Sequence, residues 1–403
     1  MDVFVARQPI FDRLGQCVAY ELLFRAGWEN IFPPVDPDSA SAHTLSNSLV
    51  SLGLDTLAGS KDVFINFTQK LLTSGAATLL PPQKAVVEVL ESVDPANAQV
   101  LESCRDLKSR GYRLALDDFV LRDESRELAG LADIIKIDYR ASSPLQRSTM
   151  VRRLESSGVA FLAEKVETAE EVREAEELGV RYLQGYFYCR PDIVAGRVIP
   201  GFKFSYVELL RELYKPDFDL DRVEKLIKSD LSLSYGLLKL VNSAAFALAR
   251  RIESMRQALV LLGQDKVRKW VSVVIMSRMA SDKPQELVVN SIIRAYFCEK
   301  LAQQTSLRTR KDDLFLMGMF SLVDAILDQP LTEALESLPI DSDIKQALLG
   351  EESELSGVLD LVLRYEKADW EGLSRCASQA GLADETLPAL YREAVQFVDS
   401  LKV

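Results

Sequence analysis

Over its first 200 residues the chain alternates short apolar runs with helical stretches such as 97–109 and 170–178, and seven of the apolar runs end in a polar side chain. This alternation is typical of an α/β domain. A (β/α) barrel gathers the C-terminal ends of its strands on one face, where active sites of this architecture lie. The sequence therefore predicts such a barrel. The polar residues at the predicted strand ends are Glu21, Asn66, Glu91, Asp117, Asp118, Lys136, Glu164 and Gln184.

Two other interpretations of these polar ends remain. A doubly wound sheet also alternates strands and helices, although it does not need a polar residue at nearly every strand end. Any one of these residues, taken alone, marks only a boundary between a strand and a loop. The repetition along the chain favours the barrel.

The segment 113–119 carries two adjacent carboxylates, Asp117 and Asp118, at the end of an apolar strand. The strand favours burial, whereas packed carboxylates repel each other and lose solvation. A divalent cation resolves this conflict, because Mg²⁺ and Mn²⁺ prefer carboxylate oxygens. The pair alone is also typical of a turn or a helix N-cap, so the metal interpretation depends on the other strand ends.

The composition excludes several classes of protein. The formal net charge of −12 argues against binding to nucleic acid polymers or to a membrane surface. No apolar run reaches the roughly 18 residues of a membrane span, and the N-terminus does not resemble a signal peptide. The five cysteines are scattered, so we expect reduced thiols and a cytoplasmic protein. His43 is the only histidine, which excludes histidine-rich metal sites and argues against a Ser-His-Asp triad.

The chain lacks the Gly-rich loops that cradle nucleotide phosphates, so metals and side chains would have to meet a phosphate. In order along the chain, the strand ends resemble the motifs of the EAL family, bacterial phosphodiesterases that open the second messenger cyclic di-GMP to linear pGpG. The resemblance covers roughly the first 200 residues. The matching segments are 20–25 (YELLFR), 64–68 (FINFT), 88–92 (EVLES), 116–119 (LDDF), 135–138 (IKID), 163–168 (AEKVET) and 184–186 (QGY), with Pro191.

The resemblance implies a role for each matching residue. The metal ligands it implies are, for one Mg²⁺ or Mn²⁺ ion, Glu21, Asn66, Glu91 and Asp117 and, for a second, Asp117, Asp118 and Glu164. The catalytic residues it implies are Lys136 and Glu164, and the residues that would help hold the nucleotide are Arg25 and Gln184. Two metals can activate a bridging water and stabilise the leaving oxygen, which needs carboxylates and no histidine. Lys136 has an alternative role as a counter-ion to the acidic cluster.

Three positions depart from the family pattern. Leu22 replaces the small residue after the motif glutamate, and the segment 120–125 replaces the Gly-rich loop that follows the aspartate pair. Lys165 stands where the family has glycine, and a cation there can pair with Glu164 and compete with a metal. We therefore expect a site that binds metal and cyclic di-GMP with weak or no hydrolysis.

After Pro200-Gly201 the pattern becomes almost entirely helical, and we place the two domains at 1–200 and 201–403. Residues 205–285 resemble the HDOD domain, a helical relative of the HD phosphohydrolases that generally lacks their metal ligands and acts in protein contacts. Ser321 stands where the relative would carry a metal-binding histidine, and Asp324 is expected to be a solvated helix position.

These features predict a cyclic di-GMP signalling protein whose helical domain contacts an unidentified protein partner. The alternatives are an active Mg²⁺- or Mn²⁺-dependent phosphodiesterase that yields pGpG and a non-enzymatic interaction scaffold. The altered loop leaves homodimerisation open.

Overall fold

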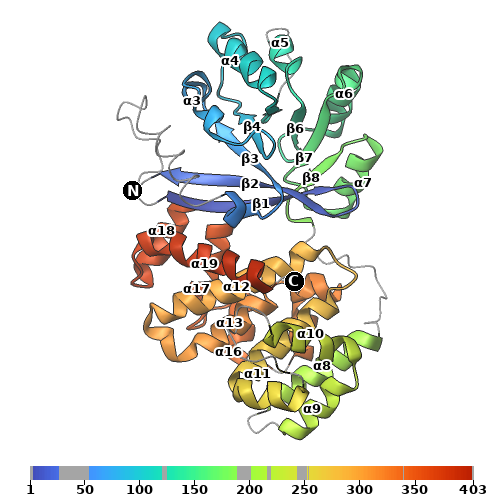
Figure 1. Ribbon diagram of the computed structural model, residues 1–403, viewed down its shortest axis with the longest axis vertical. Helices are drawn as coiled ribbons and strands as arrows, with labels where there is room; N and C mark the ends of the chain where they lie inside the picture. Colours follow the sequence, from blue (N-terminus) through green and yellow to red (C-terminus); the bar gives the residue numbers. More distant parts are fainter. Residues whose placement is uncertain are drawn as a thin grey trace. The chain divides into compact units, whose positions relative to one another are not determined.

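The computed structural model of this 403-residue chain describes residues 3–26, 54–119, 125–187, 201–215, 219–242, 252, 254–338 and 340–401. The chain divides into two compact units, Met1–Phe187 and Tyr188–Val403. The first is an α/β barrel and the second is helical (Figure 1). Within the described ranges, no helix has both the length and the apolar character needed to cross a bilayer.

The described strands close into a barrel in sequence order, which confirms the predicted fold. They are β1 (Val3–Asp12), β2 (Cys17–Ala26), β3 (Asp62–Phe67), β4 (Ala85–Val89), β5 (Arg113–Leu116), β6 (Ile134–Asp138), β7 (Ala160–Glu164) and β8 (Tyr182–Gln184). Strand β1 runs antiparallel to both β2 and β8, whereas the successive pairs from β2 to β8 are parallel. Strand β1 was not predicted, because no polar strand end of the predicted kind marks it.

Short helices connect the parallel strands. They are α2 (Leu54–Ala58), α3 (Gln69–Thr73), α4 (Ala98–Ser109), α5 (Arg126–Ala129), α6 (Pro144–Leu154) and α7 (Ala169–Glu177), with 3-10 turns η1 (Ala76–Leu79) and η3 (Glu155–Ser157). Asn97 caps α4 by accepting from the N–H groups of Gln99 and Val100, and Thr168 forms a capping box with Glu171 at the start of α7. The helices predicted at 97–109 and 170–178 are thus confirmed.

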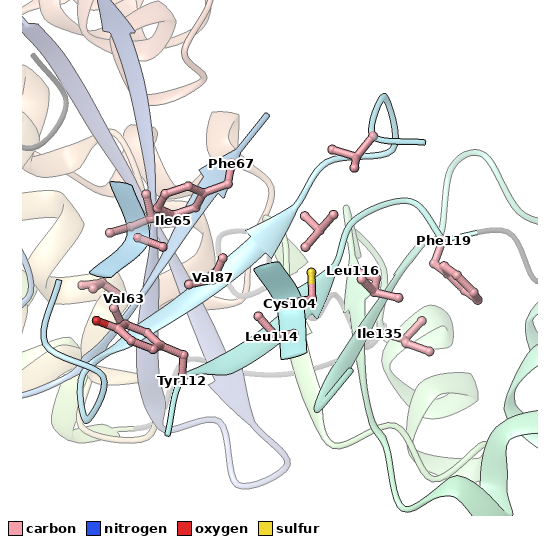
Figure 2. Packing of buried hydrophobic residues seen from close by; sticks show 14 of the residues in the cluster. Val63, Ile65, Phe67, Val87, Cys104, Tyr112, Leu114, Leu116, Phe119 and Ile135 are labelled. Atoms are coloured by element: carbon pink, nitrogen blue, oxygen red, sulfur yellow. The ribbon is translucent and has the colours of Figure 1, made fainter. Parts of the chain in front are cut away.

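Alternation along each strand separates an outer face from an inner face. On β3, for example, Val63, Ile65 and Phe67 pack outward in the core that includes residues of α4, as Figure 2 shows together with neighbouring side chains. Phe64 belongs to the separate cluster inside the barrel, and Asn66 shares its face.

The inner face has two layers. The layer toward the N-terminal ends of the parallel strands is apolar and consists of Ile10, Ala19, Phe64, Val86, Ala115, Ile134 and Leu162. The next inward positions toward the C-terminal ends are polar and are occupied by Glu21, Asn66, Glu88, Asp117, Lys136, Glu164 and Gln184. The polar side chains therefore meet next to the apolar layer, on its C-terminal side, at the end of the barrel where active sites of this architecture lie.

The second unit is built from helices α8 (Gly201–Leu213), α9 (Leu220–Lys228), α10 (Leu231–Val241), α11 (Met255–Met279), α12 (Gln285–Gln303), α13 (Lys311–Phe320), α14 (Val323–Leu327), α15 (Leu331–Ser337), α16 (Ser342–Leu348), α17 (Ser356–Glu366), α18 (Trp370–Gln379) and α19 (Leu387–Leu401), with 3-10 turns η6 (Ser306–Arg310) and η7 (Asp384–Thr386). In this unit Asp230 caps α10 by accepting from Leu233 N–H, Asn242 exchanges two hydrogen bonds with the backbone of Ile252, and Trp270 is buried.

Candidate active site at the barrel mouth

Lys136 lies at the centre of the polar layer, with its side chain 1% exposed. Its Nζ lies 2.6 Å from Glu164 Oε1, 3.2 Å from Asp117 Oδ1 and 3.4 Å from Glu21 Oε2, and it also donates to Glu88 Oε1. The four carboxylates come from β2, β4, the end of β5 and β7. One ammonium group thus holds together side chains that are far apart in the sequence.

One ammonium cannot balance four largely buried carboxylates. Burial, reinforced by the charge of Glu21, raises the pKa of Glu88 well above its ordinary value. Burial also raises the pKa of Glu164 to about 8, although Lys136 opposes the shift. Burial would raise the pKa of Glu21 too, but Lys136 and hydrogen bonds from two side-chain amides together hold it below its ordinary value. The cluster is short of positive charge, which a divalent cation would supply.

Two amide side chains hold Glu21. Asn66 Nδ2 donates to Glu21 Oε1 at 3.1 Å, and Gln184 Nε2 donates to Glu21 Oε2 at 2.7 Å and to Gln8 Oε1 at 3.2 Å. With the amide nitrogens used in this way, Asn66 Oδ1 and Gln184 Oε1 are buried and have no hydrogen-bond partner within the described ranges. Glu88 Oε2 is in the same state. Unpaired buried oxygens of this kind suit a hard cation, because carboxylate and amide oxygens are its preferred ligands.

Carboxylate oxygens gather in two groups, each with its oxygens within 4.8 Å of one another. The first group is Glu21, Glu88 and Glu164, and the second is Glu91, Asp117 and Asp118. Asp118 has a φ of 42°, and burial together with the charge of Asp117 raises its pKa. Its Oδ1 is buried and lacks a hydrogen-bond partner in the described part of the chain.

Glu88 rather than Glu91 lies beside Glu21, and the ligand role of Glu91 stays a prediction. Glu88 is 0% exposed and contacts Lys136, whereas Glu91 is exposed, follows β4 and lies with Asp117 and Asp118. Glu88 was not among the predicted site residues. The signal that distinguishes the two residues is the alternation of β4, which places Glu88 on the same face as Val86.

The sequence suggested a pair between Lys165 and Glu164. Lys165 pairs with a different carboxylate. Its side chain is 56% exposed, and its Nζ donates to Asp138 Oδ2. Burial opposes a charged lysine here, but the hydrogen bond and charge of Asp138 outweigh it and raise the pKa of Lys165. The backbone of Lys165 is left-handed, with φ of 55°, which explains why glycine suits this position. Glu164 therefore pairs with Lys136 and not with Lys165.

Two predicted features fall partly or wholly outside the described residues. Arg25 lies in β2 opposite Phe4, but its side chain is not among those described. Residues 120–124 of the altered loop at 120–125 are also outside the described ranges. Leu22, the third departure from the family pattern, packs in the outer core with 0% exposure.

The helical unit has an ion pair beside Ser321, the residue at which the resemblance to HD proteins predicted the place of a metal-binding histidine. Ser321 Oγ accepts from Arg294 Nη1 at 3.1 Å, and Arg294 Nε and Nη2 hold Glu366 Oε2 at 3.0 and 2.7 Å. Asp324 is half-buried rather than solvated, and burial raises its pKa. Within the described part of this unit, no three carboxylate, thiol or imidazole side chains converge as a metal site would require.

Comparisons with known proteins agree with this division of the chain. The family model described as EAL domain matches residues 40–191, and the one described as HDOD domain matches residues 199–337. Uncharacterized protein YuxH of Bacillus subtilis is 38% identical over 409 aligned positions, which cover 100% of this chain and 99% of that protein. The chain belongs to the EAL–HDOD family.

A second relative of this EAL–HDOD protein is cyclic di-GMP phosphodiesterase CdgJ of Vibrio cholerae. It is 39% identical over 381 positions, which cover 94% of this chain and 88% of CdgJ. Among solved structures, the calcium and cyclic di-GMP complex of Klebsiella pneumoniae BlrP1 matches 47% of this chain and 56% of that chain, with 22% identity and a TM-score of 0.40.

Proposed function

We propose that this EAL–HDOD protein binds cyclic di-GMP at the C-terminal mouth of its barrel and hydrolyses it to linear pGpG with Mg²⁺ or Mn²⁺. The observation that carries the proposal is the convergence of four carboxylates on Lys136, because a buried cluster with that excess of negative charge suits cations. The similarity to CdgJ, a cyclic di-GMP phosphodiesterase by name, supports the choice of substrate.

The side chains present fit two hard divalent ions. Asn66 Oδ1, Glu88 Oε2 and Asp118 Oδ1 are buried oxygens without partners in the described ranges, and all belong to the two carboxylate groups or contact them. The residues that would hold one ion are Glu21, Asn66, Glu88 and Asp117, and those that would hold the second are Asp117, Asp118 and Glu164. When bound, such ions lower the pKa of water and stabilise a leaving oxygen.

The protein's own residues position the reaction. Lys136 is held by carboxylates on several sides, so its N–H groups have defined directions and would orient the attacking water. Glu164 would fix Lys136 through their 2.6 Å contact. Attack of water on phosphorus breaks the bond to one ribose 3′ oxygen, which leaves with a proton and opens the ring to pGpG. Gln184 is hydrogen-bonded to Glu21 and would position that carboxylate, and its contact with the nucleotide stays a prediction, as does that of Arg25.

The rate of hydrolysis has two possible determinants in this chain. Because Lys165 pairs with Asp138, it does not compete with a metal for Glu164, which favours turnover. The loop after Phe119 lacks the glycines of the family and favours a second candidate function, a cyclic di-GMP receptor with weak or no hydrolysis. A scaffold that binds no nucleotide would not need the polar layer of the barrel.

For the helical unit we propose contact with a protein partner and no catalysis. The hydrogen bonds of Arg294 to Glu366 and Ser321 support this role, because a fixed guanidinium lies against the residue that replaces the histidine expected from the HD resemblance. The boundary at residue 200 and the cytoplasmic location stay predictions.

The experiment that tests the barrel site compares Glu88→Gln with Glu91→Gln in the full-length protein. Release of pGpG is measured with Mg²⁺ and with Mn²⁺, and binding of cyclic di-GMP is measured by calorimetry with Ca²⁺. Glu88→Gln is expected to lower turnover by roughly 10- to 100-fold, as loss of a residue that supports a metal site does, and Glu91→Gln by much less.

Equal losses in the two variants would contradict the assignment of Glu88. Tight binding without pGpG in the unmodified protein would favour the receptor. Absence of both binding and product would refute the proposed function.

A further inference from the structure

The barrel has a cavity of about 330 Å³ at the end opposite the acidic cluster. Its lining includes the residues that begin four strands, namely Asp62 on β3, Arg113 on β5, Ile134 on β6 and Tyr182 on β8. The β1–β2 turn borders it as well. Because the acidic cluster lies at the other ends of the same strands, the apolar inner layer separates the two.

The cavity has an apolar floor. Ile10, Phe64 and Ile134 line it and belong to the inner apolar layer, where they are 0%, 3% and 5% exposed. Val18 and Tyr182 pack against that layer and also line the cavity. A flat apolar group would therefore find buried hydrocarbon and an aromatic ring on which to pack.

The rim of the cavity is basic. Arg13, Arg113 and Arg181 line it together with two acids, Asp12 and Asp62. The acids are already engaged: Asp62 Oδ2 accepts from Arg113 Nη1 at 2.7 Å, and Asp12 Oδ1 accepts two backbone N–H groups of the β1–β2 turn, each at 2.9 Å.

Two of the guanidinium groups have no carboxylate partner among the described residues. Arg13 Nε donates to the backbone oxygen of Val180 at 2.7 Å, which directs the side chain from the β1–β2 turn toward the segment that precedes β8. Arg181 lies over the Tyr182 ring, 5.2 Å from its centroid. In a chain with a net charge of −12, two such arginines at the mouth of an apolar cavity form a local positive site.

We propose that this cavity is a second ligand site, which takes a small organic anion with a flat apolar body and one phosphate or carboxylate group. The planar guanidinium groups of Arg13 and Arg181 would bind the anionic group, since arginine matches the geometry of both oxyanions. The apolar body would pack on Phe64, Ile134 and Tyr182. The volume lies at the lower end of the roughly 300–1,000 Å³ of small-molecule pockets, so the ligand is small.

The test uses 4-fluorophenyl phosphate as the probe and follows its fluorine NMR signal with the full-length protein. EDTA is present, so that the acidic cluster holds no metal and repels the probe. The probe is expected to bind, and inorganic phosphate is expected to displace it only at much higher concentration, because phosphate lacks the apolar body.

Two variants test the two halves of the cavity. Arg181→Gln removes a guanidinium that lies over the Tyr182 ring and has no carboxylate partner among the described residues, and it is expected to raise the dissociation constant by about tenfold or more. Val18→Phe fills the cavity from its apolar side and is expected to abolish binding. Arg152→Gln, on the exposed side of α6, is the matched control and should bind as the unmodified protein does.

Urea unfolding of each variant confirms that the barrel is intact. Binding that survives both Arg181→Gln and Val18→Phe would place the probe elsewhere and overturn the proposal. No detectable binding to the unmodified protein would also overturn it. Neither result depends on whether the acidic cluster hydrolyses cyclic di-GMP.

Discussion

Replacing Lys136 with methionine tests whether one buried ammonium holds the barrel mouth together. The substitution keeps the length and much of the hydrocarbon of the side chain but removes the only cation that contacts Glu21, Glu88 and Glu164 in the described structure. Breaking a buried ion pair on one side typically costs about 3–5 kcal/mol, because the remaining charge stays buried without compensation. Here several carboxylates lose the same partner, so we expect a loss at least at the lower end of that range.

The free energy of opening is measured by hydrogen exchange of peptides that cover β6 and β7, because an unfolding curve of the whole chain would mix two units. A loss of about 3 kcal/mol corresponds to exchange that is about 150-fold faster. Mg²⁺ or Ca²⁺ should restore part of the protection in the variant, since a bound cation replaces the missing charge and stabilises the folded state by mass action.

Lys108→Met is the control. Lys108 pairs with Asp133 at 2.5 Å, but both side chains are 33% exposed, and such pairs are worth at most about 1 kcal/mol. If Lys136→Met accelerated exchange no more than Lys108→Met, the argument from buried charge would be refuted. Insensitivity of the Lys136→Met variant to divalent cations would count against the metal sites.

Three further substitutions test other parts of the structure. Lys165→Gly should be more stable than Lys165→Ala by about 1 kcal/mol in urea unfolding, because both lose the pair with Asp138 but only glycine relieves the left-handed backbone; equal stability would contradict the observed φ. Arg294→Met should lower the free energy of unfolding by about 3–5 kcal/mol, and the double variant Arg294→Met with Glu366→Leu should recover most of that loss. Unfolding is monitored by tryptophan fluorescence. A double variant as unstable as the single one would show that the ion pair is not the cause. Gly318→Ala should lower the free energy of unfolding, measured by heating, by about 1–3 kcal/mol, because the added Cβ would lie 2.5 Å from the backbone of Arg294. A change below about 0.5 kcal/mol would mean that α12 and α13 can move apart to make room for it.

The alternation of elements was readable from the sequence because strands and helices impose different periods on apolar residues. The helix at 97–109 followed from its helical pattern, and the barrel followed from polar residues at successive strand ends. Strand β1 was not readable in this way, because its place depends on antiparallel pairing with β2 and β8, which are close only once the barrel has closed.

The choice between Glu88 and Glu91 shows the same limit at the site. Both residues lie at the end of one apolar run. The alternation of β4 puts Glu88 on the face of Val86, and the pairing of β4 with β3 and β5 makes that face the interior of the barrel. Lys165 is a similar case: proximity in sequence suggested Glu164 as its partner, whereas its backbone conformation directs it to Asp138 on β6.

The sequence by itself therefore determined the fold class and most of the polar side chains at the mouth of the barrel, because these depend on local periodicity and residue type. Only the tertiary structure decided which acids share Lys136, since those contacts join residues as far apart as Glu21 and Glu164. It also decided that Arg294 lies against Ser321 and that three arginines line a cavity at the end of the barrel opposite the acidic cluster. The physical reason is that burial, which sets the strength of each charge interaction, exists only after distant strands and helices have packed together.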